Sequence, residues 1–374
     1  MLLRNAIIAV LLLAAIGAAV AGLAGRKPAE PADVAREGDS PLYTFVRQQF
    51  LAPDGGVYTN LRDDLPLQPH VANNHQLLSE SAGLLLQYSL QTDRRALFAQ
   101  QASFVRERLN AGSGRIRWVV DPGERIDEVT TDAAVDDLRI VRALRDGAKR
   151  WQEPAYGKLA AMIAKQLEDS VRDGEYLSDF YNWESGANAD TLTASYLDLY
   201  TLRMLGKTSP LWEQVYARSQ QLLETAALSS GLFEKQYNLQ SRAWVQTDKL
   251  NAIDSLYTAL HLAEVQADTS RTVAWVRQTW SEHGRLFNDY TRDGEPASEL
   301  ESPAVYALAY RLVKLAAPGD PLSDALYARM TLLSVQDPAS PYYGGYVDSA
   351  KREGYSFDQL QALLAEAEKD GPQS

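Results

Sequence analysis

The sequence has no cysteine in its 374 residues and only four histidines. A chain without cysteine has no disulfide scaffold, no thiolate zinc site, no iron–sulfur cluster and no thiol nucleophile. The histidines include no pair at helical spacing, so the residues for a zinc-hydrolase site are also scarce. Basic residues number 37 against 49 acidic residues, which gives a formal net charge of −12. With no stripe rich in lysine and arginine, this balance argues against nucleic acid as a partner.

Apolar residues are plentiful, at 45% of the sequence, which is enough to bury a large core. Beyond residue 40 they recur with the period of an α-helix almost to the C-terminus. Two Ser-Pro pairs, beginning at Ser209 and Ser302, place proline at a first helical position. The helices that we expect cover residues 43–50, 74–90, 94–109, 132–150, 155–171, 190–205, 211–227, 251–266, 270–287, 303–315, 320–335 and 356–367.

These twelve segments favour an all-α fold, the (α/α)6 toroid or six-hairpin barrel, in which an inner ring of helices surrounds a central cleft. Short strand-like stretches interrupt the helices at residues 115–120, 177–183 and 232–245, where we expect the mouth of the cleft. A tetratricopeptide-type solenoid is the weaker alternative, because no short exact repeat is present. We therefore expect one domain over residues 41–374.

The N-terminal residues 6–25 form an uninterrupted run of apolar or small residues. The run is about long enough to cross a bilayer as a helix. It can be a cleaved signal peptide, since Ala19-Val20-Ala21 has cleavage spacing, or an uncleaved anchor. A buried core helix is disfavoured because the run has no polar face. We expect a signal peptide or transmembrane anchor over residues 1–25, a linker over 26–40, and the rest outside the cytoplasmic membrane.

Three acidic segments carry the residues that a hydrolase would need. Glu80 stands among apolar residues near a helix start, where lost solvation would raise its pKa and let it act as a general acid. Asp132, Asp136 and Asp137 lie at the start of another helix, and Asp254 lies early in a third. Each of these residues can alternatively be a helix cap or a surface carboxylate that compensates the helix dipole.

The first segment, Ser79-Glu80-Ser81-Ala82-Gly83, resembles a motif of glycoside hydrolase family 8, the bacterial family of endoglucanases, chitosanases and xylanases. That motif reads Ser-Glu-Gly-x-Gly-Tyr-Gly and carries the general acid. The serine, the glutamate and the second glycine match. Ser81, Leu84 and Leu85 replace the first glycine, the tyrosine and the third glycine.

The second and third segments resemble the two other motifs of this family. One reads Ala-Ser/Thr-Asp-Ala/Gly-Asp-x-x-Ile-Ala-x-Ala-Leu. With Asp137 on its second aspartate the following apolar positions are in register, whereas Val135 falls on the first aspartate. Thr131-Asp132-Ala133 looks like the first half of the motif, displaced by a small insertion. The other reads Tyr-Asp-Ala-x-Arg-x-Pro-Leu-Tyr-Leu-Ala, which residues 254–263 follow with Tyr257 in place of the arginine.

The resemblance implies the (α/α)6 fold and hydrolysis with inversion at the sugar carbon. In inverting enzymes two carboxyl groups stand roughly 6.5–9.5 Å apart and hold a water opposite the leaving group. Carried over to this chain, Glu80 is the general acid and Asp254 is the general base. Asp137 contacts the sugar, with Asp132 and Asp136 as neighbours or substitutes in substrate binding. This chemistry requires no metal and no organic cofactor.

Aromatic residues in the non-helical stretches also fit a glycan cleft, because the flat faces of sugars stack on tryptophan and tyrosine. Ordinary core packing is the alternative for each of them. The aromatic residues that we expect to contact substrate are Trp118, Tyr181, Trp183, Tyr237 and Tyr257.

The resulting hypothesis is a monomeric, endo-acting glycoside hydrolase of an extracellular bacterial polysaccharide, similar to hydrolases found near exopolysaccharide synthesis genes. Should Asp254 lie too far from Glu80, Asp248 or Asp179 is the next candidate for the base. A catalytically inactive glycan-binding accessory protein is an alternative, suggested by the altered motif positions. A polysaccharide lyase of the same shape is another, disfavoured because the acidic chain would repel a polyuronide.

Overall fold

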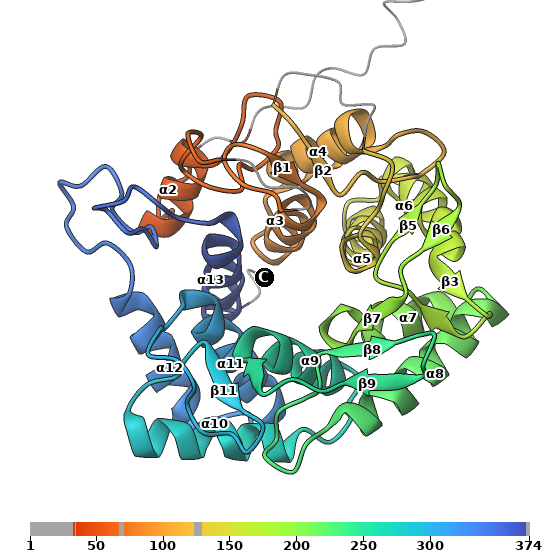
Figure 1. The fold of residues 1–374 in the computed structure, drawn as a ribbon. Helices are drawn as coiled ribbons and strands as arrows, with labels where there is room; N and C mark the ends of the chain where they lie inside the picture. The colour runs from red at the N-terminus through yellow and green to blue at the C-terminus, as the bar shows by residue number, and fades with distance from the viewer. Residues whose placement is uncertain (1–32, 34, 67–70, 123–128, 372–374) are drawn as a thin grey trace, which may run out of the picture.

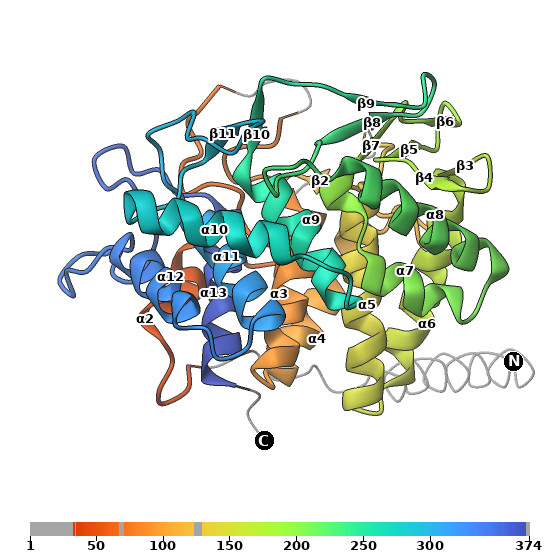
Figure 2. The same ribbon diagram turned by 90° about the horizontal axis from the view of Figure 1, so that it is seen from below.

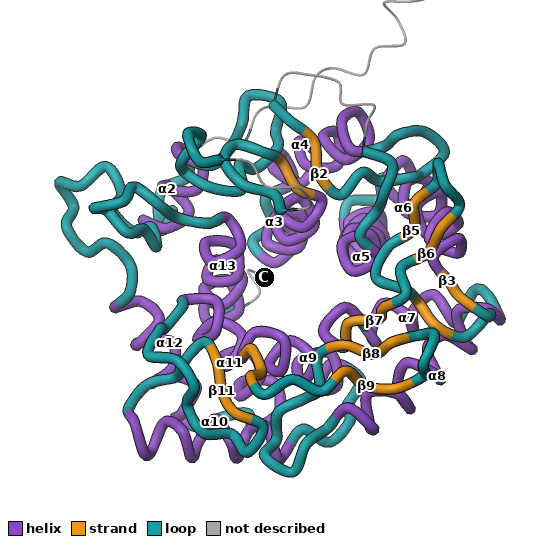
Figure 3. Tube along the Cα trace, in the orientation of Figure 1, coloured by secondary structure: helices purple, strands orange, loops and turns teal. Residues whose placement is uncertain are grey.

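The computed structural model describes residues 33, 35–66, 71–122 and 129–371 (Figure 1). The predicted apolar segment of residues 1–25 lies outside the described residues, as does most of the predicted linker. Among the helices of the described ranges, none is long and apolar enough to span a membrane. The described chain is rich in helices with small antiparallel strand pairs between them, which confirms the predicted helical fold with short strand excursions (Figure 3).

Six helices pack side by side around the middle of the molecule, each against the next in chain order and the last against the first (Figure 1). These inner helices carry mostly buried residues. On α11, for example, every residue from Pro303 to Val313 is buried, because the helix is covered on both sides. The inner helices are α3 (Ser79–Gln91), α5 (Ala134–Arg150), α7 (Leu199–Gly206), α9 (Ala252–Glu264), α11 (Pro303–Ala316) and α13 (Ser356–Asp370).

A second set of helices lies outside these six (Figure 1). Helix α2 precedes them in the sequence, and the others alternate with them. Helix α4 packs on α3, α6 on α5, α8 on α7, both α10 and α12 on α11, and α2 on α13. The outer helices are α2 (Pro41–Gln49), α4 (Arg95–Phe104), α6 (Pro154–Gln166), α8 (Pro210–Ala226), α10 (Ser270–His283) and α12 (Pro321–Leu332). Each hairpin of an inner and an outer helix therefore buries the apolar face of both.

Local capping explains where several helices begin. The hydroxyl of Ser302 accepts the backbone N–H of Val305 at the start of α11, and proline follows at the first helical position, as predicted. The side chain of Asn251 accepts the N–H of Ile253 at 2.9 Å and starts α9 in the same way. At the other end of a helix, Gly284 terminates α10 in the left-handed conformation that glycine adopts without strain.

The strands are two or three residues long and gather at one end of the helices (Figure 2). Four two-stranded pairs are β1 (Leu77–Leu78) with β2 (Val119–Val120), β3 (Val171–Arg172) with β4 (Tyr176–Leu177), β5 (Tyr181–Asn182) with β6 (Ala187–Asn188), and β10 (Lys249–Asn251) with β11 (Asp289–Thr291). A three-stranded sheet has β8 (Gln236–Asn238) in the middle, between β7 (Thr191–Thr193) and β9 (Ala243–Val245).

Strand pairing shortens two of the predicted helices at their N-terminal ends. The helix expected from residue 74 begins at Ser79, because Leu77 and Leu78 pair with Val120 and Val119. The helix expected from residue 190 begins only at Leu199. The residues before it form β7, which pairs with β8, and a short 3-10 helix, Ala194–Tyr196.

Candidate active site

The predicted acid and base occupy equivalent places in the fold. Strand β1 leads directly into α3 and β10 leads directly into α9, so both helices begin at the strand-bearing end (Figure 2). Glu80 lies in the first turn of α3 and Asp254 in the first turn of α9. Asp136 and Asp137 lie in the first turn of α5. Helix N-termini carry a partial positive charge, which stabilises carboxylates placed there.

The carboxyl group of Glu80 has a raised pKa. Burial first, and then the negative charge of Asp136, raise the pKa of Glu80 to about 7, while the nearby Arg139 lowers it. The carboxyl therefore carries its proton over a large part of the neutral pH range, and an acid with a pKa near the working pH transfers protons efficiently. The sequence predicted this desolvation, and the pKa of Glu80 agrees with that prediction.

A buried polar network surrounds Asp136. The hydroxyl of Ser79 donates to Asp136 Oδ2 at 2.6 Å, and Arg139 Nη1 donates to Asp136 Oδ1 at 2.8 Å. Arg139 also lies 3.4 Å from the hydroxyl of Tyr257, which is itself only 8% exposed. Arg139 thus connects the surroundings of Glu80 to α9. Sequence reasoning missed Arg139, because one arginine in the middle of an acidic helix start looks like a surface residue.

The other two aspartates of this segment face the protein interior. Asp137 is 1% exposed, and its Oδ1 has no hydrogen-bond partner within the described ranges. Burial and the charges of Asp132 and Asp136 raise its pKa well above the usual value. Asp132 accepts the backbone N–H of Tyr181 at 2.6 Å and the hydroxyl of Ser170 at 3.1 Å, so it joins strand β5 to the start of α5. Asp132 is therefore bonded to the surrounding chain, whereas Asp137 is enclosed with one oxygen left without a partner in the described ranges.

Asp254 is held by two donors from other parts of the chain. The hydroxyl of Ser195 donates to Oδ1 at 2.9 Å, and Lys235 Nζ lies 2.9 Å from Oδ2. The side chain of Asp254 remains 17% exposed. Two donors and no acceptor suit an ionised carboxylate, which only accepts hydrogen bonds. Neither Ser195 nor Lys235 has a recognisable signal in the sequence, because both reach Asp254 only through the packing of α9 on the preceding loops.

Several acidic groups act electrostatically on the hydroxyl of Tyr196. Its pKa is raised by burial and then by the negative charges of Asp136, Asp179, Glu80 and Asp254. These carboxyl groups come from α3, α5, α9 and the loop between β4 and β5. The Tyr196 side chain is nevertheless partly exposed, at 37% for the residue. The charges of the predicted acid and the predicted base therefore both act on one phenol.

The two alternative candidates for the base differ in their surroundings. Asp179 accepts three hydrogen bonds, from the hydroxyl of Thr191 at 2.8 Å and from the N–H and hydroxyl of Thr193 at 2.6 and 3.0 Å. These contacts fasten β7 and leave Asp179 few free acceptor sites. Asp248 is exposed in the loop before β10. Asp179 and Asp254 are both held by donors and both half-buried, and Asp254, with two donors against three, keeps more of its acceptor capacity.

The aromatic residues predicted to contact substrate differ in exposure and in surroundings. Trp118 is half-buried, and its carbonyl accepts the N–H of Ser79 beside Glu80. Tyr181 and Trp183 are half-buried near the start of α5. Tyr237, on β8, is only 8% exposed and packs against the rings of Tyr176 and Trp244. Tyr257 is also 8% exposed, and its hydroxyl contacts Arg139.

A group of three potential metal ligands lies at the other end of α9 from Asp254. One ligand atom from each of Asp198, His261 and Glu264 lies within 4.8 Å of the others. Arg142 Nη1 lies 2.9 Å from Glu264 Oε1 and 3.9 Å from Asp198 Oδ2. The guanidinium thus stands where a metal ion would bind both carboxylates, and it lowers the pKa of Glu264, to about 2.

Comparisons with known proteins agree with this architecture. No family model matches the chain. YdaJ of Bacillus subtilis (strain 168), a candidate lipoprotein, is 30% identical over 312 residues, which are 83% of this chain and 84% of YdaJ. A solved alpha-amylase from Clostridium perfringens is 26% identical and superposes with a TM-score of 0.80 over 88% of this chain and 96% of its own. The family 8 endoglucanase Cel10 from Klebsiella pneumoniae, 14% identical, superposes with a TM-score of 0.62 over 88% of this chain and 99% of its own.

Proposed function

Because the chain belongs to a divergent branch of glycoside hydrolase family 8, we propose that it hydrolyses an extracellular bacterial polysaccharide with inversion. Glu80 acts as the general acid and Asp254 as the general base. The observation that carries the proposal is the placement of Glu80 and Asp254 in the first turns of two inner helices at the strand-bearing end, with a raised pKa at Glu80 and a donor-held carboxylate at Asp254. An acid and a base of this kind are what inversion requires.

The helices form an (α/α)6 toroid in this proposal. The cyclic order of packing, from α3 through α5, α7, α9 and α11 to α13 and back to α3, supports it. Only a closed ring brings the first turns of α3 and α9, far apart in the sequence, to one cleft. The domain covers residues 41–374 and acts as a monomer, with endo action on its substrate. Residues 1–25 serve as its signal peptide or membrane anchor, and residues 26–40 as its linker.

In the reaction, the neutral carboxyl of Glu80 donates its proton to the glycosidic oxygen as the bond to the sugar carbon breaks. The carboxylate of Asp254 takes a proton from the water that attacks the opposite face of that carbon. For this water to fit, the two carboxyl groups must stand roughly 6.5–9.5 Å apart. Lys235 and Ser195 keep Asp254 pointed at the cleft through their hydrogen bonds. Neither step needs a metal or an organic cofactor.

For the contact with the sugar we propose Asp137, the residue that the motif match assigned, with Asp136 as the neighbour that sets the charge beside Glu80. Both aspartates are enclosed, at 1% and 5% exposure, but both oxygens of Asp136 accept hydrogen bonds from Ser79 and Arg139, whereas Oδ1 of Asp137 has no partner within the described ranges. Asp136 is the aspartate of this segment whose charge acts on both Glu80 and Tyr196. Trp118, Tyr181 and Trp183 supply half-buried aromatic faces close to these residues for stacking on sugar rings.

The test of the function is hydrolysis of defined polysaccharides by the full chain. The panel contains α-1,4-glucan and β-1,4-glucan, on which the names of the similar amylase and endoglucanase bear, together with bacterial exopolysaccharides. Reducing ends should appear with the wild type and fall at least about a hundredfold with Glu80→Gln. Glu184→Gln, in an exposed turn, is the matched control and should keep full activity.

An inactive glycan-binding protein is the competing function, favoured by the changes at Ser81, Leu84 and Tyr257 relative to the family motifs. It predicts binding without release of reducing ends, and no effect of Glu80→Gln on any biological activity. If no polysaccharide of the panel is cut while one of them binds, the hydrolase proposal fails and the binding protein replaces it.

A further inference from the structure

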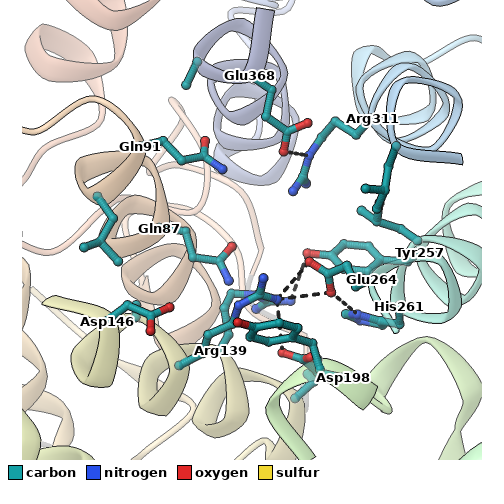
Figure 4. A pocket seen from close by; sticks show the side chains of 18 of the residues that line it. Gln87, Gln91, Arg139, Asp146, Asp198, Tyr257, His261, Glu264, Arg311 and Glu368 are labelled. Atoms are coloured by element: carbon teal, nitrogen blue, oxygen red, sulfur yellow. Dashed lines mark hydrogen bonds and ion pairs between the residues drawn. The ribbon is translucent and has the colours of Figure 1, made fainter. Parts of the chain in front are cut away.

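A cavity of about 670 Å³ opens between the inner helices, away from Glu80 and Asp254 (Figure 4). Its walls come mostly from the later turns of α3, α5, α9, α11 and α13 and from the start of α7, whereas the proposed acid and base lie in the first turns of α3 and α9. Arg139 and Tyr257, joined through the contact of 3.4 Å, separate the cavity from the network of Asp136. Its volume lies within the range of small-molecule sites, about 300–1,000 Å³.

The charges that line the cavity are balanced. Arg142 Nη1 contacts both oxygens of Glu264, at 2.9 and 3.1 Å, and Arg311 Nε donates to Glu368 Oε1 at 2.7 Å. These ion pairs leave little excess positive charge to attract an anion. A metal ion is equally disfavoured, because the Arg142 guanidinium already stands between the carboxylates of Asp198 and Glu264. The occupant that fits this lining is neutral.

Two polar side chains in the lining have hydrogen-bonding capacity that the described part of the chain does not use. His261 is 5% exposed, and its Nε2 has no hydrogen-bond partner there. The Oε1 of Gln91, on the opposite wall, also has none. Figure 4 shows the side chains of Gln87 and Gln91 reaching into the same space as Tyr257 and His261. Buried polar atoms are normally paired, so a polar ligand in the cavity would supply the partners that these side chains lack once they turn toward it.

We propose that this cavity binds a short neutral saccharide, one or two rings long, at a place separate from the site of hydrolysis. Vicinal hydroxyl groups both donate and accept, which suits an amide, an imidazole and the edges of ion pairs at once. The ring of Tyr257 offers an aromatic face beside these groups, and such faces stack on the C–H face of a sugar. The inference rests on the cavity alone and does not require that the chain be a hydrolase.

The experiment is titration calorimetry on the full chain carrying Glu80→Gln, so that no bound saccharide is cut. The probes are maltose, cellobiose and N,N′-diacetylchitobiose, with inorganic phosphate and glucuronate as charged probes. We expect at least one neutral disaccharide to bind and both charged probes to fail. Adding Gln91→Leu should weaken that binding about tenfold, as expected for a lost hydrogen bond. Gln214→Leu, on the exposed side of α8, is the matched control and should leave binding unchanged.

Three outcomes would overturn the proposal. The first is that none of the neutral disaccharides binds although the variants keep the melting temperature of the wild type. The second is that a charged probe binds and Gln91→Leu weakens it. The third is that Trp118→Ala, which lies beside Glu80, abolishes disaccharide binding while Gln91→Leu leaves it intact, since the ligand then occupies the catalytic cleft. All three outcomes are binding measurements, which do not depend on polysaccharide hydrolysis. A chain that hydrolyses no polysaccharide would therefore contradict the proposed function without contradicting this inference.

Discussion

The substitution Asp136→Asn tests the electrostatics around Glu80 directly. Burial and the charge of Asp136 raise the pKa of Glu80 from the usual 4.5 to about 7, against the opposing charge of Arg139. At about 1.4 kcal/mol per pKa unit, this rise corresponds to about 3 kcal/mol in favour of the protonated acid. Asparagine keeps the shape of the side chain and an oxygen for the hydroxyl of Ser79, but it removes the charge.

We expect Asp136→Asn to lower the pKa of Glu80 by about one unit. The contribution of burial, the largest cause, remains, and Arg139 acts on Glu80 more strongly once it is no longer paired with Asp136. A general acid works only while protonated, so activity is lost as the pH rises through its pKa. The alkaline limb of kcat/KM should therefore move from about pH 7 to about pH 6, and activity at about pH 8 should fall roughly tenfold.

The measurement is release of reducing ends from the best polysaccharide between about pH 4 and pH 9, for the wild type and Asp136→Asn. Titration of ¹³C-labelled glutamate carboxyls by NMR gives the same pKa without activity. Asp173→Asn, whose side chain is 64% exposed on a turn, is the control and should leave the profile unchanged. An alkaline limb that stays in place or moves upward in Asp136→Asn would show that Asp136 does not act on the catalytic acid.

Three further predictions concern the site and the stability of the fold. Glu80→Gln and Asp254→Asn should each lower kcat by about a hundredfold or more with the melting temperature unchanged; a tenfold loss or less in either would remove it from the catalytic pair. Gly83→Ala should lower the melting temperature, because its Cβ would meet the Cδ of Arg139 at 3.0 Å, and calorimetry showing equal or higher stability would contradict this packing. Burial raises the pKa of Asp358 to about 6, so folding favours the protonated form of this carboxyl. The stability that the protonated form contributes is present below about pH 4 and is lost as the pH rises through about 6. Asp358→Asn should therefore raise the free energy of unfolding by up to about 3 kcal/mol at about pH 8 and little at about pH 4, and denaturation that shows no such pH dependence would refute the assignment.

Features that depend on neighbouring residues could be predicted from the sequence. The helical period located the inner and outer helices, since burial of one face imposes that period along each segment. The Ser302-Pro303 pair marked the start of α11, because a cap is formed within one turn. The same local reasoning placed Glu80 and Asp254 early in helices, and the pKa of Glu80 follows the predicted desolvation.

Features that depend on residues distant in the sequence needed the tertiary structure. Residues 191–193 lie in the segment expected as a helix from residue 190 but form β7, because the backbone of residues 236–238 pairs with them. The side chains of Ser195 and Lys235 meet Asp254 only after the loops fold onto α9. No pattern within one segment specifies such contacts, since they arise from the way separate segments pack.

The aspartates at the start of α5 show both kinds of feature, those set by neighbouring residues and those set by tertiary packing. The sequence identified a group of aspartates there, and the helix start explains why they are tolerated. Adjacent residues on a helix point about 100° apart, so one register step decides which carboxyl faces Arg139 and which faces the core. Packing of α5 between α3 and α7 set that register, with Asp136 toward Ser79 and Arg139 and Asp137 enclosed. The sequence alone thus determined that carboxyl groups would stand at these helix starts, and the packing of α5 against α3 and α7 decided which of them faces Glu80, because the orientation of a helix depends on its neighbours.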